Sequence, residues 1–297
     1  MTEYGQAWTI RRLLEWTTPF FTRKGVDSPR LSAELLLAHV LKLPRIRLYT
    51  GYENPIPENE LATFRDLVKR AVEQEPIAYL TGTAHFFNLE FEVNRDVLIP
   101  RPETETLVEH VLQLVRNTPG LERPRVLDLC TGSGCVAAAI AHHLKSSSVL
   151  ATDKSAAAAT VARKNIQRLG LDGRVQIEQG DLYEAVQKQV DSQPFDLIVA
   201  NPPYIRSDEI AKLDRNVRDY EPMAALDGGP DGLVVHRRII AGAADRLVSG
   251  GRIYLEIAFD QGELARHVVG TAEGFEDLSV LKDYGGRDRV VSARKSG

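Results

Sequence analysis

Short apolar runs alternate with helical stretches through the second half of this 297-residue chain. The runs are too short for buried helices and are bounded by glycine, proline and polar residues, which is typical of buried strands. Strands are expected at 126–129, 148–152, 175–178, 195–200 and 252–257, helices at 135–144, 155–169 and 233–247, and a β-rich tail at 275–294. Strands that alternate with helices pair in parallel and are covered on both faces. The pattern therefore predicts an α/β fold with a doubly wound, mainly parallel sheet.

Residues 1–80 show a different pattern. Leucine and other apolar residues recur at helical spacing over 31–41 and 58–75, and a proline ends each stretch. Ser28 and Pro29 are expected as the N-cap and the first-turn residue of the earlier helix. Several short helices with little strand pattern predict a small helical bundle.

Between these two parts the pattern changes once more. Apolar and polar residues alternate around 85–99, which favours a β-hairpin, and a further helix is expected over 104–115. We therefore predict a helical bundle over 1–80, a hairpin linker over 81–100 and an α/β domain over 101–297.

Composition limits the compartment and the partners. The formal net charge is -4, and basic residues are interspersed with acidic ones, so no general attraction to nucleic acid is expected. The two cysteines, Cys130 and Cys135, are too few for a disulfide framework, and their spacing matches no common zinc pattern. The chain begins without a leader-like segment and contains no apolar run of about 18 residues. We expect a monomeric cytoplasmic protein that binds no metal, membrane or nucleic acid directly.

A glycine-containing turn follows the first expected strand and leads into a helix. It consists of Cys130, Thr131, Gly132, Ser133 and Gly134. Glycine lets a ligand approach the backbone closely, and the N-terminus of the following helix supplies free N–H groups. The turn is also compatible with a nicotinamide dinucleotide site, because Ala137 can stand in for a third glycine. A P-loop is excluded, since no Gly-Lys-Ser/Thr sequence follows.

Acidic residues follow the next two expected strands. Asp153 is placed either to accept hydrogen bonds from both hydroxyls of a ribose or to cap the helix that begins near Ser155. Asp181 and Leu182 come after the third strand, where an adenine ring can lie, and a plain turn is an equal alternative. Because the carboxyl ends of parallel strands meet at one edge of the sheet, we expect these residues to lie close together.

The most distinctive loop is Asn201-Pro202-Pro203-Tyr204, directly after the apolar run 195–200. Proline has a fixed φ and no N–H, so the Asn201 side chain and the carbonyl groups of Asn201 and Pro202 form a rigid row of acceptors. An amide or amino group offers two donors to such a row, and Tyr204 adds an aromatic face. Taken alone, a proline-rich turn after a buried strand is the commoner interpretation.

In combination, these features resemble the class I S-adenosylmethionine-dependent methyltransferases whose Asn-Pro-Pro-Tyr loop acts on planar nitrogens. More narrowly, the chain resembles the HemK/PrmC family of release-factor glutamine methyltransferases over roughly residues 28–294. The matching segments are Pro76-Ile77-Ala78-Tyr79-Leu80-Thr81-Gly82, Val97-Leu98-Ile99-Pro100-Arg101-Pro102-Glu103-Thr104-Glu105, Tyr220-Glu221-Pro222, Ala225-Leu226-Asp227-Gly228-Gly229-Pro230-Asp231-Gly232 and Glu256.

The resemblance implies a Rossmann-like fold, S-adenosylmethionine as methyl donor, S-adenosylhomocysteine as product and peptide chain release factors as partners. The residues it assigns to the donor are Cys130, Thr131, Gly132, Ser133, Gly134, Asp153, Asp181, Leu182 and Asn201. Those it assigns to the glutamine of a Gly-Gly-Gln motif are Asn201, Pro202, Pro203 and Tyr204. Catalysis by Asn201, Pro202 and Tyr204 would consist mainly of aligning the amide nitrogen with the methyl group, without a general base.

Some residues depart from the family pattern or admit two interpretations. Cys130 stands where the family commonly has glycine, and Leu182 where some members have an aromatic residue near the adenine. Arg101 and Glu103 either anchor the segment between the domains or line the substrate mouth, and anchoring is preferred. The bundle either docks the release factor or caps the catalytic domain. The alternative functions are a glutamine methyltransferase of a ribosomal protein, an adenine amino-group methyltransferase of nucleic acid, a nicotinamide-dependent oxidoreductase and a non-catalytic binding module.

Overall fold

The computed structural model describes residues 7–187 and 193–297. The chain forms two compact units. Unit 1 consists of Met1–Thr83 and Asp214–Tyr220, and unit 2 of Ala84–Leu213 and Glu221–Gly297. The predicted division at residues 80 and 100 stays a prediction for the functional domains. The compact units differ from it in two places, because the hairpin lies in unit 2 from Ala84 onward and a short later segment belongs to unit 1.

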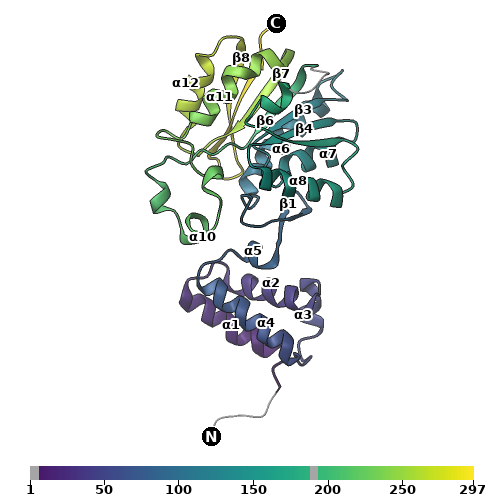
Figure 1. The fold of residues 1–297 in the computed structure, drawn as a ribbon, viewed down its shortest axis with the longest axis vertical. Coiled ribbons are helices and arrows are strands. Elements are labelled where there is room, and N and C mark those ends of the chain that lie inside the picture. Colours follow the sequence, from purple (N-terminus) through teal and green to yellow (C-terminus); the bar gives the residue numbers. More distant parts are fainter. Residues whose placement is uncertain (1–6, 188–192) are drawn as a thin grey trace. The chain divides into compact units, whose positions relative to one another are not determined.

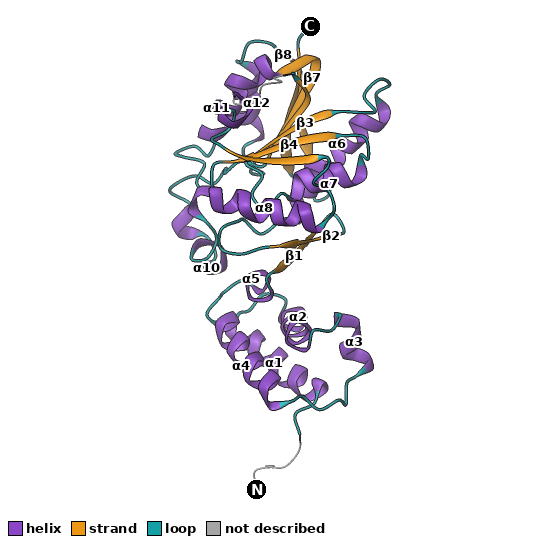
Figure 2. Cartoon of the chain, turned by 45° about the vertical axis from the view of Figure 1, so that its right-hand side comes forward, coloured by secondary structure: helices purple, strands orange, loops and turns teal. Residues whose placement is uncertain are grey.

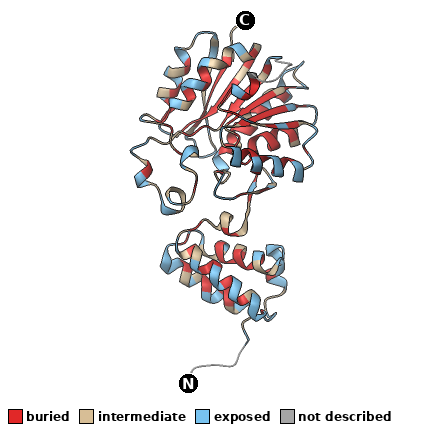
Figure 3. Ribbon diagram, viewed as in Figure 1, coloured by how far each residue is buried: buried red, intermediate tan, exposed pale blue. Residues whose placement is uncertain are grey.

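Unit 1 is a helical bundle with its own apolar core. Its helices are α1 (Ile10–Lys24), α2 (Pro29–Leu41), α3 (Arg45–Thr50), α4 (Glu58–Val72), α5 (Ile77–Thr81) and the short α10 (Arg215–Arg218). Leu14, Phe21, Leu36 and Phe64 are buried in one cluster, and α1, α2 and α4 show their exposed residues on the outside (Figure 3). The segment with α10 is held to the bundle by the Tyr220 hydroxyl, which donates to the Glu73 carbonyl at 3.1 Å.

The start of α2 confirms one expectation and corrects another. The helix begins at Pro29, but the Ser28 side chain makes no capping hydrogen bond. A capping side chain needs an extended backbone, whereas Ser28 is left-handed with a φ of 44°. The first turn is instead held by Ser32, whose N–H donates to the Ser28 carbonyl at 2.9 Å and whose hydroxyl donates to the Asp27 carbonyl at 2.6 Å.

Unit 2 is built on a seven-stranded sheet with the order β5-β4-β3-β6-β7-β9-β8. Its strands are β3 (Arg125–Leu129), β4 (Ser148–Asp153), β5 (Val175–Gln179), β6 (Phe195–Ala200), β7 (Leu247–Glu256), β8 (Phe275–Lys282) and β9 (Asp288–Lys295). All neighbouring pairs from β5 to β7 are parallel, and β9 is antiparallel to β7 and β8. The predicted doubly wound, mainly parallel sheet is confirmed.

Helices cover both faces of this sheet (Figures 1 and 2). On one side lie α6 (Glu105–Asn117), α7 (Cys135–His143) and α8 (Ala156–Arg168), and on the other α11 (Val234–Ala243) and α12 (Gly262–Gly270). The remaining short helices are α9 (Glu184–Gln187) and the 3-10 turns η1 (Pro102–Thr104), η2 (Ile210–Lys212), η3 (Met223–Ala225) and η4 (Ala244–Arg246). The strands β3, β4 and β6 are mostly buried between the two helical layers, as the apolar runs predicted, whereas β8 at the edge of the sheet has no buried residue (Figure 3). In the described residues, no helix is long and apolar enough to cross a membrane.

The predicted hairpin consists of β1 (Thr83–Phe86) and β2 (Leu89–Glu92). Its turn residues Phe87 and Asn88 both have positive φ, which suits the right-handed twist of a tight hairpin. Asn165 of α8 fixes β2 with two hydrogen bonds, accepting from the Glu92 N–H at 2.7 Å and donating to the Glu92 carbonyl at 2.9 Å. The hairpin is therefore packed on the α/β unit.

Strand order reverses between β3 and β6. In open α/β sheets a crevice forms at such a point, outside the carboxyl ends of the strands, because the helices of the two halves lie on opposite faces. The glycine turn follows β3 and the Asn-Pro-Pro-Tyr loop follows β6, so the fold places both at this crevice.

Candidate active site

A cavity of about 750 Å³ lies at the carboxyl ends of β3 to β6. Of the residues predicted for the site, those that line it are Cys130, Thr131, Gly132, Ser133, Asp153, Asp181, Leu182, Asn201 and Pro203. Gly134, Pro202 and Tyr204 are not part of its wall. The volume is in the range of cavities that hold cofactors and other small ligands.

The glycine turn is held in shape by its neighbours. The Gly132 N–H donates to Asp153 at 2.9 Å, and the Thr131 N–H donates to the Thr152 carbonyl at 3.0 Å. Gly134 serves packing, because a Cβ there would lie 3.3 Å from the Ala162 Cβ, and its φ of 81° starts α7. Only part of the turn is thus available to a ligand.

Cys130 has a left-handed backbone, with a φ of 58°. This conformation costs a non-glycine residue about 1–2 kcal/mol, whereas glycine adopts it without that cost. Burial raises the pKa of the Cys130 thiol, and it raises that of Cys135 to about 12. Both thiols are therefore protonated at neutral pH and are not nucleophiles.

Asp153, at the end of β4, is hydrogen-bonded both to the glycine turn and to the residues that follow β4. Its two oxygens accept from Gly132 at 2.9 Å and from the Ser155 N–H at 2.8 Å. The alternative that Asp153 caps α8 is wrong, since the cap is Ser155, whose hydroxyl accepts from Ala158 at 3.2 Å. Each carboxylate oxygen has about two acceptor positions and uses one here, so Asp153 keeps capacity toward the cavity.

Asp181 and Leu182 form the next part of the wall. One Asp181 oxygen lies 3.5 Å from the Lys154 ammonium and 3.1 Å from the Arg238 guanidinium. The Leu182 carbonyl accepts from the Thr152 hydroxyl at 3.3 Å. Both residues are held in fixed positions, which a plain turn does not require.

Asn201 borders the cavity. Its side-chain NH2 donates to the Thr104 hydroxyl at 3.0 Å, and within the described residues no donor is bonded to its side-chain oxygen. Thr104 is buried and itself borders the cavity. Sequence reasoning placed Thr104 only at a helix start and gave it no role in the site.

A second loop fixes the backbone that follows Asn201. The Ile205 N–H donates to the Leu226 carbonyl at 3.0 Å, and the Gly228 N–H donates to the Ile205 carbonyl at 2.8 Å. Gly232 packs so closely that a Cβ there would lie 2.3 Å from the Tyr204 carbonyl oxygen. The glycines of this loop therefore let two backbones meet.

Gln261 completes this support. Its side chain is fully buried, donates to the Tyr204 carbonyl at 2.8 Å and accepts from the Ala258 N–H at 2.9 Å. No local pattern marked Gln261 in the sequence, because its partners come from a distant loop.

The Tyr204 ring does not lie in the cavity wall, where an aromatic face beside the amide was expected. Burial, and then the nearby Glu256 carboxyl, raise the pKa of the Tyr204 hydroxyl. The hydroxyl is therefore protonated at neutral pH.

Arg101 both anchors and lines the site. Its guanidinium pairs with the buried Glu221, whose other oxygen accepts from the Ile99 N–H at 3.2 Å. Arg101 also borders the cavity, so each of its two predicted roles holds in part. Glu103 is not among the wall residues.

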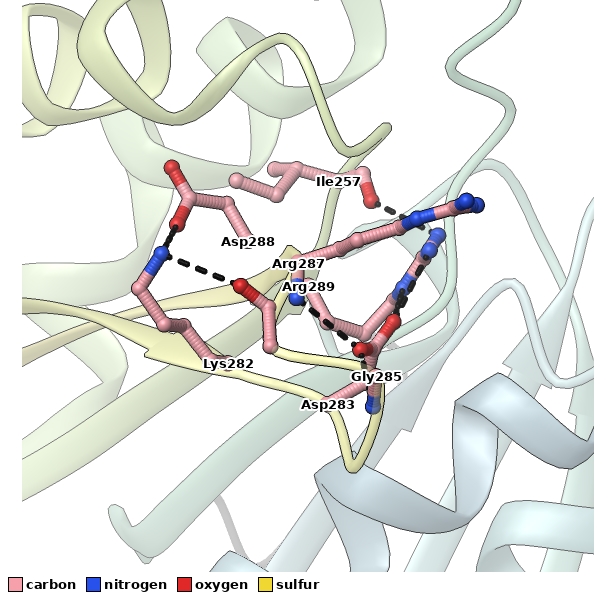
Figure 4. A network of polar contacts seen from close by, with 8 residues as sticks. Ile257, Lys282, Asp283, Gly285, Arg287, Asp288 and Arg289 are labelled. Atoms are coloured by element: carbon pink, nitrogen blue, oxygen red, sulfur yellow. Dashed lines mark hydrogen bonds and ion pairs between the residues drawn. The ribbon is translucent and has the colours of Figure 1, made fainter.

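A network of polar contacts surrounds the turn between β8 and β9 and includes the residue that follows β7 (Figure 4). Asp283, in the turn between β8 and β9, accepts from Arg289 at 3.2 Å, and hydrogen bonds from the Arg287 N–H and the Arg289 guanidinium lower its pKa. Arg289 also donates to the Ile257 carbonyl at 3.4 Å. The residue after β7 is thus tied to the β8–β9 turn.

Within the described ranges, no group of three or more His, Cys, Asp or Glu side chains is arranged to hold a metal ion. His236 is buried, and burial lowers its pKa to about 4. The Nε2 atom of its neutral imidazole donates to the Glu256 carbonyl oxygen at 2.7 Å.

Comparison with known proteins identifies the family. The model of the PrmC N-terminal domain matches residues 12–82, and that of the methyltransferase small domain matches residues 104–216. The release factor glutamine methyltransferase of Rhodopirellula baltica is 39% identical over 290 residues, 97% of each chain. The protein of the same name from Geobacter sulfurreducens is 41% identical over 294 residues, 99% of each chain.

A solved methyltransferase from Pyrococcus furiosus is similar in fold, with a TM-score of 0.51, 19% identity, and coverage of 81% of this chain and 100% of that chain. It supports the class I methyltransferase fold. The two curated relatives are 39% and 41% identical to this chain over nearly its full length. The chain therefore belongs to the family of release factor glutamine methyltransferases.

Proposed function

We propose that this protein transfers a methyl group from S-adenosylmethionine to the side-chain amide nitrogen of glutamine in the Gly-Gly-Gln motif of peptide chain release factors. The observation that carries the proposal is the Asn201 side chain, which borders the cavity and gives its NH2 to Thr104 at 3.0 Å, so that its oxygen is left as an acceptor. An oxygen so placed accepts from an amide NH2. The names of the two relatives supply the substrate class.

The chain's own residues fit the donor. Asp153 has acceptor capacity for ribose hydroxyls, the glycine turn lies before the N-terminus of α7, and Asp181 and Leu182 stand where an adenine would lie. When bound, S-adenosylmethionine supplies an electrophilic methyl group on a sulfonium. The protein's task is then to hold an amide nitrogen in line with it.

Alignment dominates this mechanism. The Asn201 side chain, at the cavity wall, accepts one amide hydrogen, and the Pro202 carbonyl is the proposed second acceptor, although Pro202 itself is not a wall residue. Well-oriented reactants gain about 7–11 kcal/mol over free collision, more than one hydrogen bond supplies. The same acceptors bind the nitrogen more strongly as it gains positive character, which stabilises the transition state selectively.

Incubation with labelled S-adenosylmethionine, a release factor and DNA tests this proposal. We expect label on the release factor, at the glutamine of its Gly-Gly-Gln motif by peptide mass mapping, because the amide NH2 offers a donor to each acceptor and both curated relatives are named for this substrate. A release factor with that glutamine changed to alanine is the control and should stay unlabelled. Label on DNA or on the control would overturn the assignment.

We also propose that the bundle docks the release factor, so that the chain divides by function at residues 80 and 100. The separate match of residues 12–82 to a domain model and the separate core of unit 1 support this division. We further propose that the protein works as a cytoplasmic monomer and makes no direct nucleic-acid contact; the net charge of -4 supports the last point.

Removing residues 1–80 should raise the KM for the release factor at least about tenfold, because docking lowers the free energy of the encounter. The Kd for S-adenosylmethionine should change less than about threefold, since the cavity is lined only from unit 2. Steady-state kinetics and calorimetry measure the two constants. Equal losses in both would refute docking and favour a capping role.

A further inference from the structure

Glu256 has a feature that the proposed mechanism does not use. It ends β7, beside the end of β6, and it is fully buried. Within the described residues, neither of its carboxyl oxygens has a hydrogen-bond partner. Buried polar groups are almost always bonded, and leaving a carboxyl unpaired is strongly unfavourable. Such a group points to a role in the site.

The hydroxyls of Thr104 and Tyr204 lie next to this carboxyl. Both hydroxyls lower the pKa of the carboxyl, although neither reaches hydrogen-bond geometry with it. Thr104 is also the residue that accepts from Asn201. A path of polar groups therefore runs from Glu256 past the Thr104 hydroxyl, which is not bonded to it, to the Asn201 amide, which is bonded to Thr104.

Other charged groups face Glu256 from each packed element. Burial raises its pKa to about 7, Arg289 of β9 lowers it, and Glu103 of η1 raises it. From α11, the neutral His236 donates to the Glu256 backbone carbonyl. Glu256 thus changes charge near neutral pH.

We propose, building on the function proposed above, that Glu256 is a positioning residue that sets the orientation of the Asn201 amide through the Thr104 hydroxyl. A carboxylate accepts hydrogen bonds and donates none. The negative carboxylate attracts the hydrogen of the Thr104 hydroxyl, and a hydroxyl turned that way can only accept from Asn201. Asn201 is forced to give its NH2 to Thr104 and to turn its oxygen to the substrate.

Protonation of Glu256 removes this constraint. A neutral acid can donate to Thr104, and Thr104 can then donate to the Asn201 oxygen, which reverses the path. With its amide flipped, Asn201 turns its NH2 toward the substrate NH2. Both groups are donors, so no hydrogen bond forms between them. Turnover is therefore expected to rise with pH through about 7, as the carboxylate forms.

The test compares Glu256→Gln with two Thr104 variants. Glutamine keeps the shape but can donate, so we expect kcat at pH 8 to fall roughly 10- to 100-fold, with the S-adenosylmethionine Kd and the release-factor KM each within about threefold. The rise of kcat near pH 7 should disappear. Thr104→Val should lose kcat similarly, and Thr104→Ser should restore it. Thr17→Val, at a buried threonine of unit 1 whose hydroxyl has no partner, is the matched control.

A readout without turnover separates this inference from the proposed function. In ¹⁵N NMR spectra of the full chain, the Asn201 side-chain NH2 signals should titrate with a midpoint near pH 7, and should not titrate in Glu256→Gln. If the titration is present but no release factor is methylated, the proposed function fails while the positioning role stands. A wild-type pH profile in Glu256→Gln, or full kcat in Thr104→Val, would overturn the positioning role. Because the pH profile of Glu256→Gln and the kcat of Thr104→Val come from different variants, one of them still tests the positioning role if the other variant does not fold.

Discussion

Replacing Asn201 with alanine should lower kcat for the release factor about 10³-fold, because it removes the side-chain acceptor that aims the amide nitrogen. The Kd for S-adenosylmethionine should stay within about threefold, since the glycine turn and Asp153 are untouched. Rapid-mix methylation assays give kcat, and calorimetry gives Kd.

Asn59→Ala is the matched control for this substitution, because Asn59 is an exposed asparagine of α4 in unit 1. It should leave both constants unchanged. If Asn201→Ala kept turnover within tenfold of the native protein, alignment by this side chain would be the wrong model. A loss of donor binding equal to the loss of turnover would instead assign Asn201 to the donor.

Replacing Gly232 with alanine should lower the free energy of unfolding by about 2–5 kcal/mol and lower kcat as well. The added Cβ would lie 2.2 Å from the Gln261 side-chain nitrogen and 2.3 Å from the Tyr204 oxygen, at a φ of 77°. The Tyr204 backbone must move, and the acceptors before it move with it. Denaturant unfolding and steady-state kinetics measure the two effects.

Gly173→Ala is the matched control, because a Cβ at Gly173 meets nothing within 4 Å and its φ is not positive. It should change the free energy of unfolding by less than about 1 kcal/mol. If Gly232→Ala were as stable and as active as this control, the close packing of the two loops would not be what holds the Asn-Pro-Pro-Tyr loop.

Much of the fold was predictable because its signals are local. The strand over 195–200 has the bounds that its apolar run indicated, since a buried parallel strand is apolar on both faces. Ends were harder. The expected helix 233–247 is an α-helix only over Val234–Ala243, followed by a 3-10 turn, and β7 begins at Leu247. Ser28 failed as a cap because backbone conformation, not residue type alone, decides capping.

The wall of the site was predictable for a similar reason. Residues that directly follow parallel strands must meet at one edge of the sheet, so Asp153 and Asn201 could be placed together without a structure. The residues that hold the Asn-Pro-Pro-Tyr loop in place could not be predicted in this way. Gln261 contacts Tyr204 across 57 positions, and Thr104 contacts Asn201 across 97. Such pairings depend on tertiary packing, which no periodicity in the sequence reports.

Two acids with elevated pKa values, Asp128 and Glu256, make folding and protonation depend on each other. Burial raises each pKa to about 7, from 3.8 and 4.5 respectively. Between those limits the unfolded chain has released protons that the native chain still holds, so folding takes up protons. The contribution of this pair to stability therefore decreases as pH rises from about 4 to about 7, at up to about 1.4 kcal/mol per pH unit for each acid. Mild acid should favour the native state at these two positions, the reverse of what salt-bridged surface carboxylates do.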